Sequence, residues 1–316
     1  MSFDLAAAVR DAKPGETVKV PAGRYTVNLE LTKPITLLAM GQAVLDGVHS
    51  GSVVRITTDG LVRLSGFTLV GGNAPEAGGA ICLLEGSLEL SDCILRFNKA
   101  PMYGGGGLYV RDGKAKITRC RFEANTGRQG GALLVDGAAE VRLEDSTVIQ
   151  NAAVEGGGIK VKEGAKLEVF ACTLADNKVV GDGAAGSALH CGGTTTRAPT
   201  VSVAQSIISE RTEGPACVFN HAKLPAALSI SRSLLPAWCK SLASLGAGNK
   251  FGEAGFVMSG AEPYLLADSS PAIGAGESGA FPSGSKDVTG RVRARGGIVD
   301  LGAFAFVQKS ASNVGY

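Results

Sequence analysis

The chain has 316 residues, of which 45 are glycine and 45% are hydrophobic, and its 31 basic and 29 acidic residues leave a net charge of +2. This apolar content supports a continuous core and excludes wholesale disorder. The balanced charge excludes the basic surface of a nucleic-acid-binding protein, and no apolar stretch reaches the roughly 18 residues that would span a membrane.

The N-terminal segment and the cysteines bear on the cellular compartment. Residues 1–16 lack the basic and apolar regions of a signal peptide, so we expect a cytoplasmic protein, or a secreted one if a leader was removed. Of seven cysteines, Cys93, Cys120 and Cys172 occupy one position of the repeat described below, where they would stack as small buried groups. An odd number in such positions favours reduced thiols.

Residues 3–12 have the pattern of a short amphipathic helix. Ser2 can cap it, Asp4 favours its positive end, and Pro14 followed by glycine ends it. Its apolar face would cover the open end of a stack of strands. That face consists of Leu5, Ala8, Val9 and Ala12.

Short β-branched segments separated by turn residues follow, and from Leu61 they repeat. One phrase ends in asparagines that are 27, 26 and 26 residues apart, and its copies are LSDCILRFN, ITRCRFEAN, LEDSTVIQN and VFACTLADN. A period in the twenties that combines short apolar segments with glycine indicates a solenoid. We align the repeats on Gly66, Cys93, Cys120, Ser146, Cys172, Ser206 and Ser233, and the single interval of 34 residues reflects an insertion before Val201.

Each repeat holds three strand-like segments and no helix, which predicts an all-β, parallel β-helix. Residues 1–239 would form the capping helix and the coils, and residues 240–316 the last coils and a C-terminal cap of the same continuous domain. Strands of successive coils lie about 4.8 Å apart, so equivalent positions stack. Alternation predicts the inward stacks, which are Leu88, Leu90, Ala115, Ile117, Val141, Leu143, Leu167 and Val169, and Leu95, Phe122, Val148 and Leu174.

Charged residues occupy two outward stacks. Opposite charges in successive coils would support the register by a few tenths of a kcal/mol per pair. One stack is Glu89, Lys116, Arg142 and Glu168, and the other is Asp92, Arg119 and Asp145. We interpret both as structural ladders.

The glycine clusters and asparagine phrases resemble a known repeat family. The segments GGAI, GGLY, GGAL and GGGI, alternating with FEAN (residues 122–125), resemble the GGA[ILV] and FxxN motifs of polymorphic outer membrane protein repeats. The whole chain resembles bacterial right-handed, single-stranded parallel β-helix proteins of the pectate-lyase-like superfamily, including their closing segment, in which Gly274 replaces the usual aspartate. This resemblance implies the fold, which hosts both enzymes and inert scaffolds.

An enzyme of this superfamily would act on an exposed strand face with carboxylates, a lysine or arginine base, or calcium. The residues that fit such a polysaccharide lyase or epimerase are Asp92, Lys116, Arg119, Arg142 and Asp145. The sequence lacks the residue sets of polygalacturonases and alginate epimerases. We therefore favour the charge-ladder interpretation over catalysis.

Three other groups of residues are candidate sites. His190 and His221 are 31 residues apart, close to one enlarged coil, and with Cys191 and Cys217 beside them they could hold a soft metal, although ordinary placement is favoured. The repeated asparagines would bond to backbone and to each other. Loops between each asparagine and its glycine cluster suit recognition, and they present Tyr103, Arg128, Gln129, Glu155 and Asp182.

The sequence therefore predicts a non-catalytic β-helix that binds a polysaccharide or a protein through its coil faces and loops. The alternative is a carbohydrate-active enzyme, a polysaccharide lyase or epimerase, that acts on a uronic-acid polymer; calcium is a candidate cofactor only if the protein is a lyase. The expected protein needs no cofactor, does not insert into a membrane and does not bind nucleic acid. Self-assembly through its ends or sides is a third hypothesis.

Overall fold

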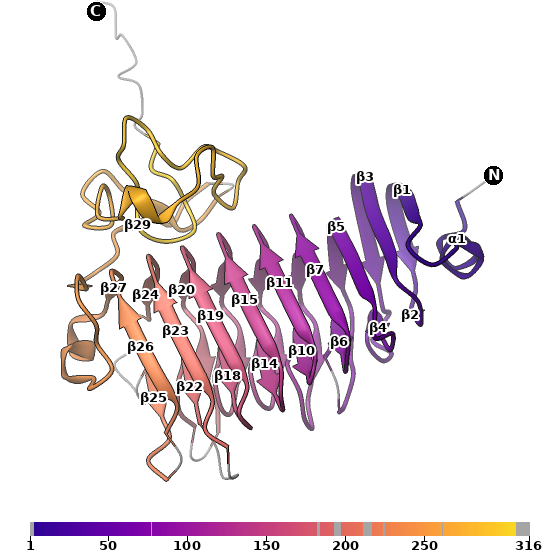
Figure 1. The fold of residues 1–316 in the computed structure, drawn as a ribbon, viewed down its shortest axis with the longest axis horizontal. Coiled ribbons are helices and arrows are strands. Elements are labelled where there is room, and N and C mark those ends of the chain that lie inside the picture. The colour runs from indigo at the N-terminus through magenta and orange to yellow at the C-terminus, as the bar shows by residue number, and fades with distance from the viewer. Residues whose placement is uncertain are drawn as a thin grey trace, which may run out of the picture.

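The structure, a computed structural model, describes residues 3–76, 78–181, 184–192, 197–210, 217–223, 225–260 and 262–307. Over these ranges the chain winds as the predicted parallel β-helix, with its coils side by side along one axis (Figure 1). Three strands of each regular coil lie on three faces of the solenoid, and a short fourth strand follows the asparagine. No helix in the described ranges is long and apolar enough to cross a membrane.

The first face and the second face form one continuous sheet, because the long strands β1, β3 and β5 bend from one face into the other. The strands that begin on the first face are β1 (Thr17–Thr26), β3 (Ile35–Asp46), β5 (Leu61–Val70), β7 (Ser87–Ser91), β11 (Lys114–Thr118), β15 (Glu140–Glu144), β19 (Lys166–Phe170), β23 (Thr200–Ala204) and β26 (Ala227–Ser231). The second face continues with β8 (Ile94–Arg96), β12 (Arg121–Glu123), β16 (Thr147–Ile149), β20 (Thr173–Ala175), β24 (Ile207–Ser209), β27 (Leu234–Leu235) and β28 (Lys250–Phe251).

The third face is a separate sheet, and the short fourth strands form a ribbon beside it. The third face consists of β2 (Leu29–Leu31), β4 (Val54–Ile56), β6 (Ile81–Leu83), β10 (Leu108–Arg111), β14 (Leu133–Asp136), β18 (Ile159–Val161), β22 (Leu189–Cys191) and β25 (Val218–Asn220). The ribbon consists of β9 (Lys99–Ala100), β13 (Thr126–Gly127), β17 (Ala152–Ala153) and β21 (Lys178–Val179).

The predicted stacks are confirmed. All twelve residues predicted to point inward are buried in the core. On the outside, Lys116 lies opposite Glu89 and Arg142, and Arg142 lies opposite Glu168. The alignment needs one correction: Ser65 pairs with Ser91 and Thr68 with Ile94, so Phe67, not Gly66, is equivalent to Cys93. Gly66 is instead equivalent to Asp92 and occupies the left-handed corner next to that position, with φ +82°.

Single residues in the left-handed region make the corner between the first and second faces. Asp92, Arg119 and Asp145 have φ between +48° and +55°, values that side chains other than glycine rarely adopt. The backbone N–H of the residue after this corner finds a hydrogen-bond acceptor in the following coil: the N–H of Cys120 donates to Ser146 Oγ at 3.0 Å. Each corner is therefore held by contacts between coils.

A ladder of buried asparagines holds the second corner. Each Nδ2 donates to Oδ1 of the next asparagine at 3.0 Å, along Asn98, Asn125, Asn151 and Asn177. The same Oδ1 atoms accept the backbone N–H of the preceding asparagine. Asn177 Nδ2 donates at 3.3 Å to Glu210, whose pKa burial raises to about 9. The structural role predicted for these asparagines is thus confirmed.

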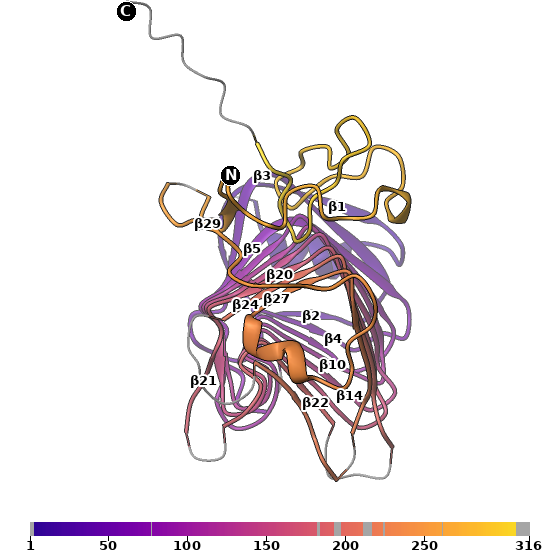
Figure 2. The ribbon, with the colours of Figure 1, turned by 90° about the vertical axis from the view of Figure 1, so that its left-hand side faces the viewer.

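Short helical segments close both ends of the solenoid. At the N-terminal end, α1 (Leu5–Asp11) packs Leu5 and Val9 into the core, and Asp4 caps it by accepting the Ala7 N–H at 2.9 Å. The predicted cap, Ser2, lies outside the described residues. At the other end, the 3₁₀ helix η1 (Ala237–Ser241) lies across the opening and buries Cys239 (Figure 2).

The segment after Gly252 folds back along the solenoid (Figures 1 and 2). It contains the antiparallel strands β29 (Phe256–Val257) and β30 (Leu265–Leu266) and the 3₁₀ helix η2 (Ser278–Ala280). Apolar residues of this segment pack against Ile149 and Ile207 of the second face. Most of the segment expected to close the end therefore lies on the side of the solenoid.

Candidate functional site

An outward row on the third face carries unusual side chains. The register places Cys82, Tyr109, Leu134, Lys160, His190 and Phe219 at one position of successive strands. Their neighbours along the strands, such as Ile159 and Val161 around Lys160, are in the core. Because side chains alternate along a strand, this row points away from the core.

The loops that precede the third-face strands cover this row. Gln129, Glu155 and Ala185 pair as single parallel bridges, so these loops stack as the strands do. Glycines let the loops pass close to one another: a Cβ at Gly131 would lie 2.1 Å from the Gly157 carbonyl oxygen. The outward row is buried from Cys82 to His190, and only its last member, Phe219, is half-buried.

Lys160 is a buried lysine in this row, 2% exposed. Its Nζ donates to Glu155 Oε2 and to the Gly192 carbonyl, both at 3.0 Å. Burial, the main cause, lowers the pKa of Lys160, although Glu155 opposes the shift. Burial would raise the pKa of Glu155, but the Lys160 ammonium outweighs it and lowers that pKa.

His190 follows Lys160 in the row and is 4% exposed. Neither ring nitrogen has a hydrogen-bond partner within the described part of the chain, and the ring contacts Phe219 edge to face at 4.7 Å between centroids. Burial, helped by the charge of Lys160, lowers the pKa of His190 to about 4, so the ring is neutral at pH 7. Among the described residues five buried side-chain polar atoms lack a partner, and three of them belong to His190 and Gln129.

A hydrogen-bonded group adjoins these residues. Tyr103 donates to Asp136 Oδ2 at 2.8 Å and accepts from Lys162 Nζ at 2.6 Å. Burial raises the pKa of Tyr103. Burial would lower the pKa of Lys162, but the bond to Tyr103 and the charge of Asp136 outweigh it and raise that pKa. This group fixes a cation at the edge of the site.

These side chains surround a cleft of about 110 Å³, which we call the Lys160 cleft. It offers cationic donors, carboxylate acceptors and a neutral imidazole within one small volume. Its lining residues are Gln129, Glu155, Lys160, Lys162, Glu163, His190 and His221.

The recognition residues predicted from the loops fall partly in this site. Gln129 and Glu155 line the cleft, and Tyr103 joins it through Lys162. Arg128 is exposed on the same loop as Gln129, and Asp182 lies outside the described residues.

Sequence reasoning missed Lys160, Lys162 and Asp136, because the segments that hold them read only as strands and turns. One signal was present: Lys160 occupies a repeat position that Tyr109 and Leu134 fill with large, partly or wholly apolar side chains.

The two histidines considered for metal binding do line this cleft, but the cysteines lie elsewhere. Cys191 and Cys217 belong to the core, since alternation turns Cys191 away from its neighbour His190. Within the described part of the chain, no group of three or more histidine, cysteine, aspartate or glutamate side chains is placed to hold a metal ion. The Lys160 ammonium already supplies a positive charge at this position.

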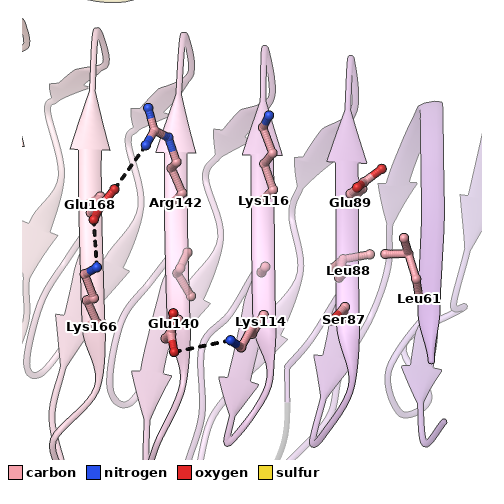
Figure 3. Close-up of a pocket in the computed structure, with 12 residues that line it drawn as sticks. Leu61, Ser87, Leu88, Glu89, Lys114, Lys116, Glu140, Arg142, Lys166 and Glu168 are labelled. Atoms are coloured by element: carbon pink, nitrogen blue, oxygen red, sulfur yellow. Dashed lines mark hydrogen bonds and ion pairs between the residues drawn. The ribbon is translucent and has the colours of Figure 1, made fainter. Parts of the chain in front are cut away.

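The first face carries a different site, a shallow trough of about 390 Å³ that we call the first-face trough (Figure 3). Arg142 pairs with Glu144 at 2.6 Å and with Glu168 at 3.2 Å, while Lys116 makes no ion pair in the described ranges. The charged residues that line the trough are Glu89, Lys114, Lys116, Glu140, Arg142, Lys166 and Glu168.

The corner residues considered for catalysis lie beside this trough and are engaged in contacts. Arg119 binds Asp92 through two hydrogen bonds of 2.7 Å. Asp145 accepts a hydrogen bond of 2.5 Å from Arg293 of the C-terminal segment, whose side chain is fully buried. Burial, opposed by Arg293, raises the pKa of Asp145.

Residues 52–224 match the model of the right-handed β-helix region family, which is more than half of the chain. The chain belongs to this family. The β-helix protein also resembles the crystal structure of pectate lyase Pel9A over 96% of this chain and 91% of that chain, with 13% identity and a TM-score of 0.47. No curated protein matches it. The family fixes the right-handed fold, and the geometry of the two sites must carry any functional argument.

Proposed function

We propose that this β-helix protein binds a polysaccharide on its third face, with the Lys160 cleft holding one sugar residue. The observation that carries the proposal is the gathering of unpartnered polar atoms of His190 and Gln129 in this one cleft. A buried polar group without a partner costs about 1–3 kcal/mol. A ligand that supplies hydrogen bonds to these atoms would recover that free energy on binding.

The chemistry of the lining residues suits hydroxyl groups. A sugar hydroxyl both donates and accepts, and the cleft offers matching partners of both kinds: Lys160 and Lys162 donate, whereas Glu155 and neutral His190 accept. The half-buried Tyr103 ring adds an amphipathic surface at the edge. The concave shape and small volume favour a single ring over a protein surface, since protein interfaces bury about 800 Å² on each partner.

Calorimetric titration with a panel of neutral, amino and uronic oligosaccharides tests the proposal. We expect at least one to bind, and His190→Phe to weaken its affinity about tenfold or more, which corresponds to the loss of roughly 1.4 kcal/mol. Lys116→Ala in the first-face trough is the matched control and should leave the affinity unchanged. Failure of every sugar to bind, or a loss of affinity confined to the control variant, overturns the proposal.

A second candidate function is a polysaccharide lyase that uses the same cleft, and it is favoured by one observation. Lys160 is buried, and burial lowers its pKa, which is the direction of shift that favours a lysine as a general base. Its neutral amine would remove the proton at C5 of a uronate residue, the C4–C5 double bond would form as the C4–O bond breaks, and the departing glycosidic oxygen would take a proton from water. Lys162 would face the uronate carboxylate.

The ultraviolet absorbance of an unsaturated product tests this candidate, in assays with and without added calcium. We expect Lys160→Met to abolish product formation and the exposed Lys114→Met to leave it intact. Sugar binding without any unsaturated product on uronic polymers would exclude the lyase and leave the binding function.

A further inference from the structure

Two of the buried thiols face one another at the C-terminal end of the solenoid. Cys217 leads into β25, and Cys239 lies in η1, the segment that closes the stack. Their sulfur atoms are 2.8 Å apart, closer than the 3.5–4.0 Å at which even carbon atoms are in contact. Both side chains are in the core, with 4% and 3% of their surface exposed.

The geometry points to a disulfide between Cys217 and Cys239 that fastens the closing segment to the last rung of the third face. A disulfide bond is about 2.04 Å long, so the sulfur atoms need to approach by only about 0.8 Å. This assignment replaces our expectation of wholly reduced thiols for these two residues, and it does not depend on the proposed sugar site.

The attachment points are themselves well anchored. The carbonyl of Cys217 accepts the N–H groups of Ala188 and Leu189 from the preceding rung. On the other side, the N–H of Cys239 donates to the Pro236 carbonyl and its carbonyl accepts the N–H of Leu242, so that both residues that flank η1 hold it. A bond between two such fixed positions closes a loop of 22 residues and restrains the unfolded chain more than the folded one.

The remaining cysteines sit differently. Cys93, Cys120 and Cys172 stack at the first corner, and their sulfurs lie beside backbone carbonyls such as that of Leu90. Serine takes this position in other coils, where its hydroxyl bonds to the backbone. These cysteines therefore act as small corner residues.

The reaction needs an oxidant of the disulfide class, such as oxidised glutathione. The Cys239 thiolate attacks one sulfur of the oxidant and releases a glutathione thiolate. Cys217 then loses its proton and attacks the mixed disulfide, so that the bond forms and a second glutathione leaves. Because both thiols are buried in the folded chain, this exchange takes place during folding or partial opening of the end.

The test uses the full chain, refolded in a glutathione redox buffer and then alkylated under denaturing conditions. Of the seven cysteines, five should be alkylated, and peptide mapping should join Cys217 to Cys239. The oxidised protein should melt several degrees above the reduced one, since a loop of this size contributes stability of the usual order for disulfides. Seven alkylated cysteines, or a different linked pair, overturn the assignment.

Two variants separate the bond from general effects on folding. Cys239→Ser should abolish both the linked peptide and the difference in melting temperature between the oxidised and reduced protein. Cys172→Ser is the matched control, because serine fills its position in neighbouring coils, and it should retain both. Retention of the melting difference in Cys239→Ser would contradict the proposal.

Discussion

The first-face trough and the Lys160 cleft pair the same two residue types in different surroundings. In the trough, Lys114 and Glu140 lie 3.5 Å apart with side chains 70% and 53% exposed. In the cleft, Lys160 and Glu155 lie 3.0 Å apart with side chains 3% and 37% exposed. Water screens the first pair and barely reaches the lysine of the second. Burial by the covering loops, and not the identity of the residues, therefore separates a stabilising ladder from a chemically distinct site.

The largest effect should come from pH and His190. Its folded pKa of about 4 lies below the ordinary value near 6.5. Between these values the unfolded chain takes up a proton that the folded chain does not, so the free energy of unfolding falls as pH drops from about 6.5 to 4. The total decrease is about 3 kcal/mol.

Chemical denaturation at pH 7 and pH 4 measures this dependence. In His190→Phe, the free energy of unfolding should fall much less between pH 7 and pH 4, because most of the decrease of about 3 kcal/mol comes from this histidine. His49→Asn, on an exposed turn with positive φ, is the control and should behave as the parent does. An unchanged decrease in His190→Phe would show that the imidazole is not held neutral.

The second prediction breaks the buried ion pair. Glu155→Gln removes the carboxylate that stabilises the Lys160 ammonium, and we expect the free energy of unfolding at pH 7 to fall by about 1–3 kcal/mol. Glu163→Gln provides the comparison, because Glu163 lines the same cleft but makes no ion pair in the described part of the chain. Its substitution should change stability by less than about 0.5 kcal/mol. Equal effects of the two variants would mean that the Lys160–Glu155 pair contributes nothing measurable to the free energy of unfolding.

The smallest effect should come from the trough. Lys114→Ala removes one partner of an exposed pair, so we expect a loss of only about 0.2–1 kcal/mol that shrinks as salt is added. Denaturation at low and high ionic strength measures it. If the free energy of unfolding fell by more than about 2 kcal/mol and did not depend on salt, the exposed pair of the trough would not differ in strength from the buried pair of the cleft.

The sequence predicted the parts of the molecule that depend on short-range periodicity. Alternation placed Leu95 and Phe122 inward, and the period of 26 or 27 residues placed Asn125 above Asn98, because both rules follow from the geometry of stacked strands. The sequence did not predict the burial of Lys160, since this burial depends on the path of loops from neighbouring coils. The contact of Arg293 with Asp145, which are 148 residues apart, is equally invisible to local patterns.

The return of the C-terminal segment along the second face has a consequence for biosynthesis. Ile149 and Ile207 are covered by residues of the segment after Gly252, which the ribosome adds only after the coils. The coils can stack as they emerge, since each needs only its predecessor. The apolar strip on their side stays exposed to solvent until the segment after Gly252 has been synthesised. During that interval the nascent chain presents chaperones, or other nascent chains, with an apolar surface that the folded chain buries.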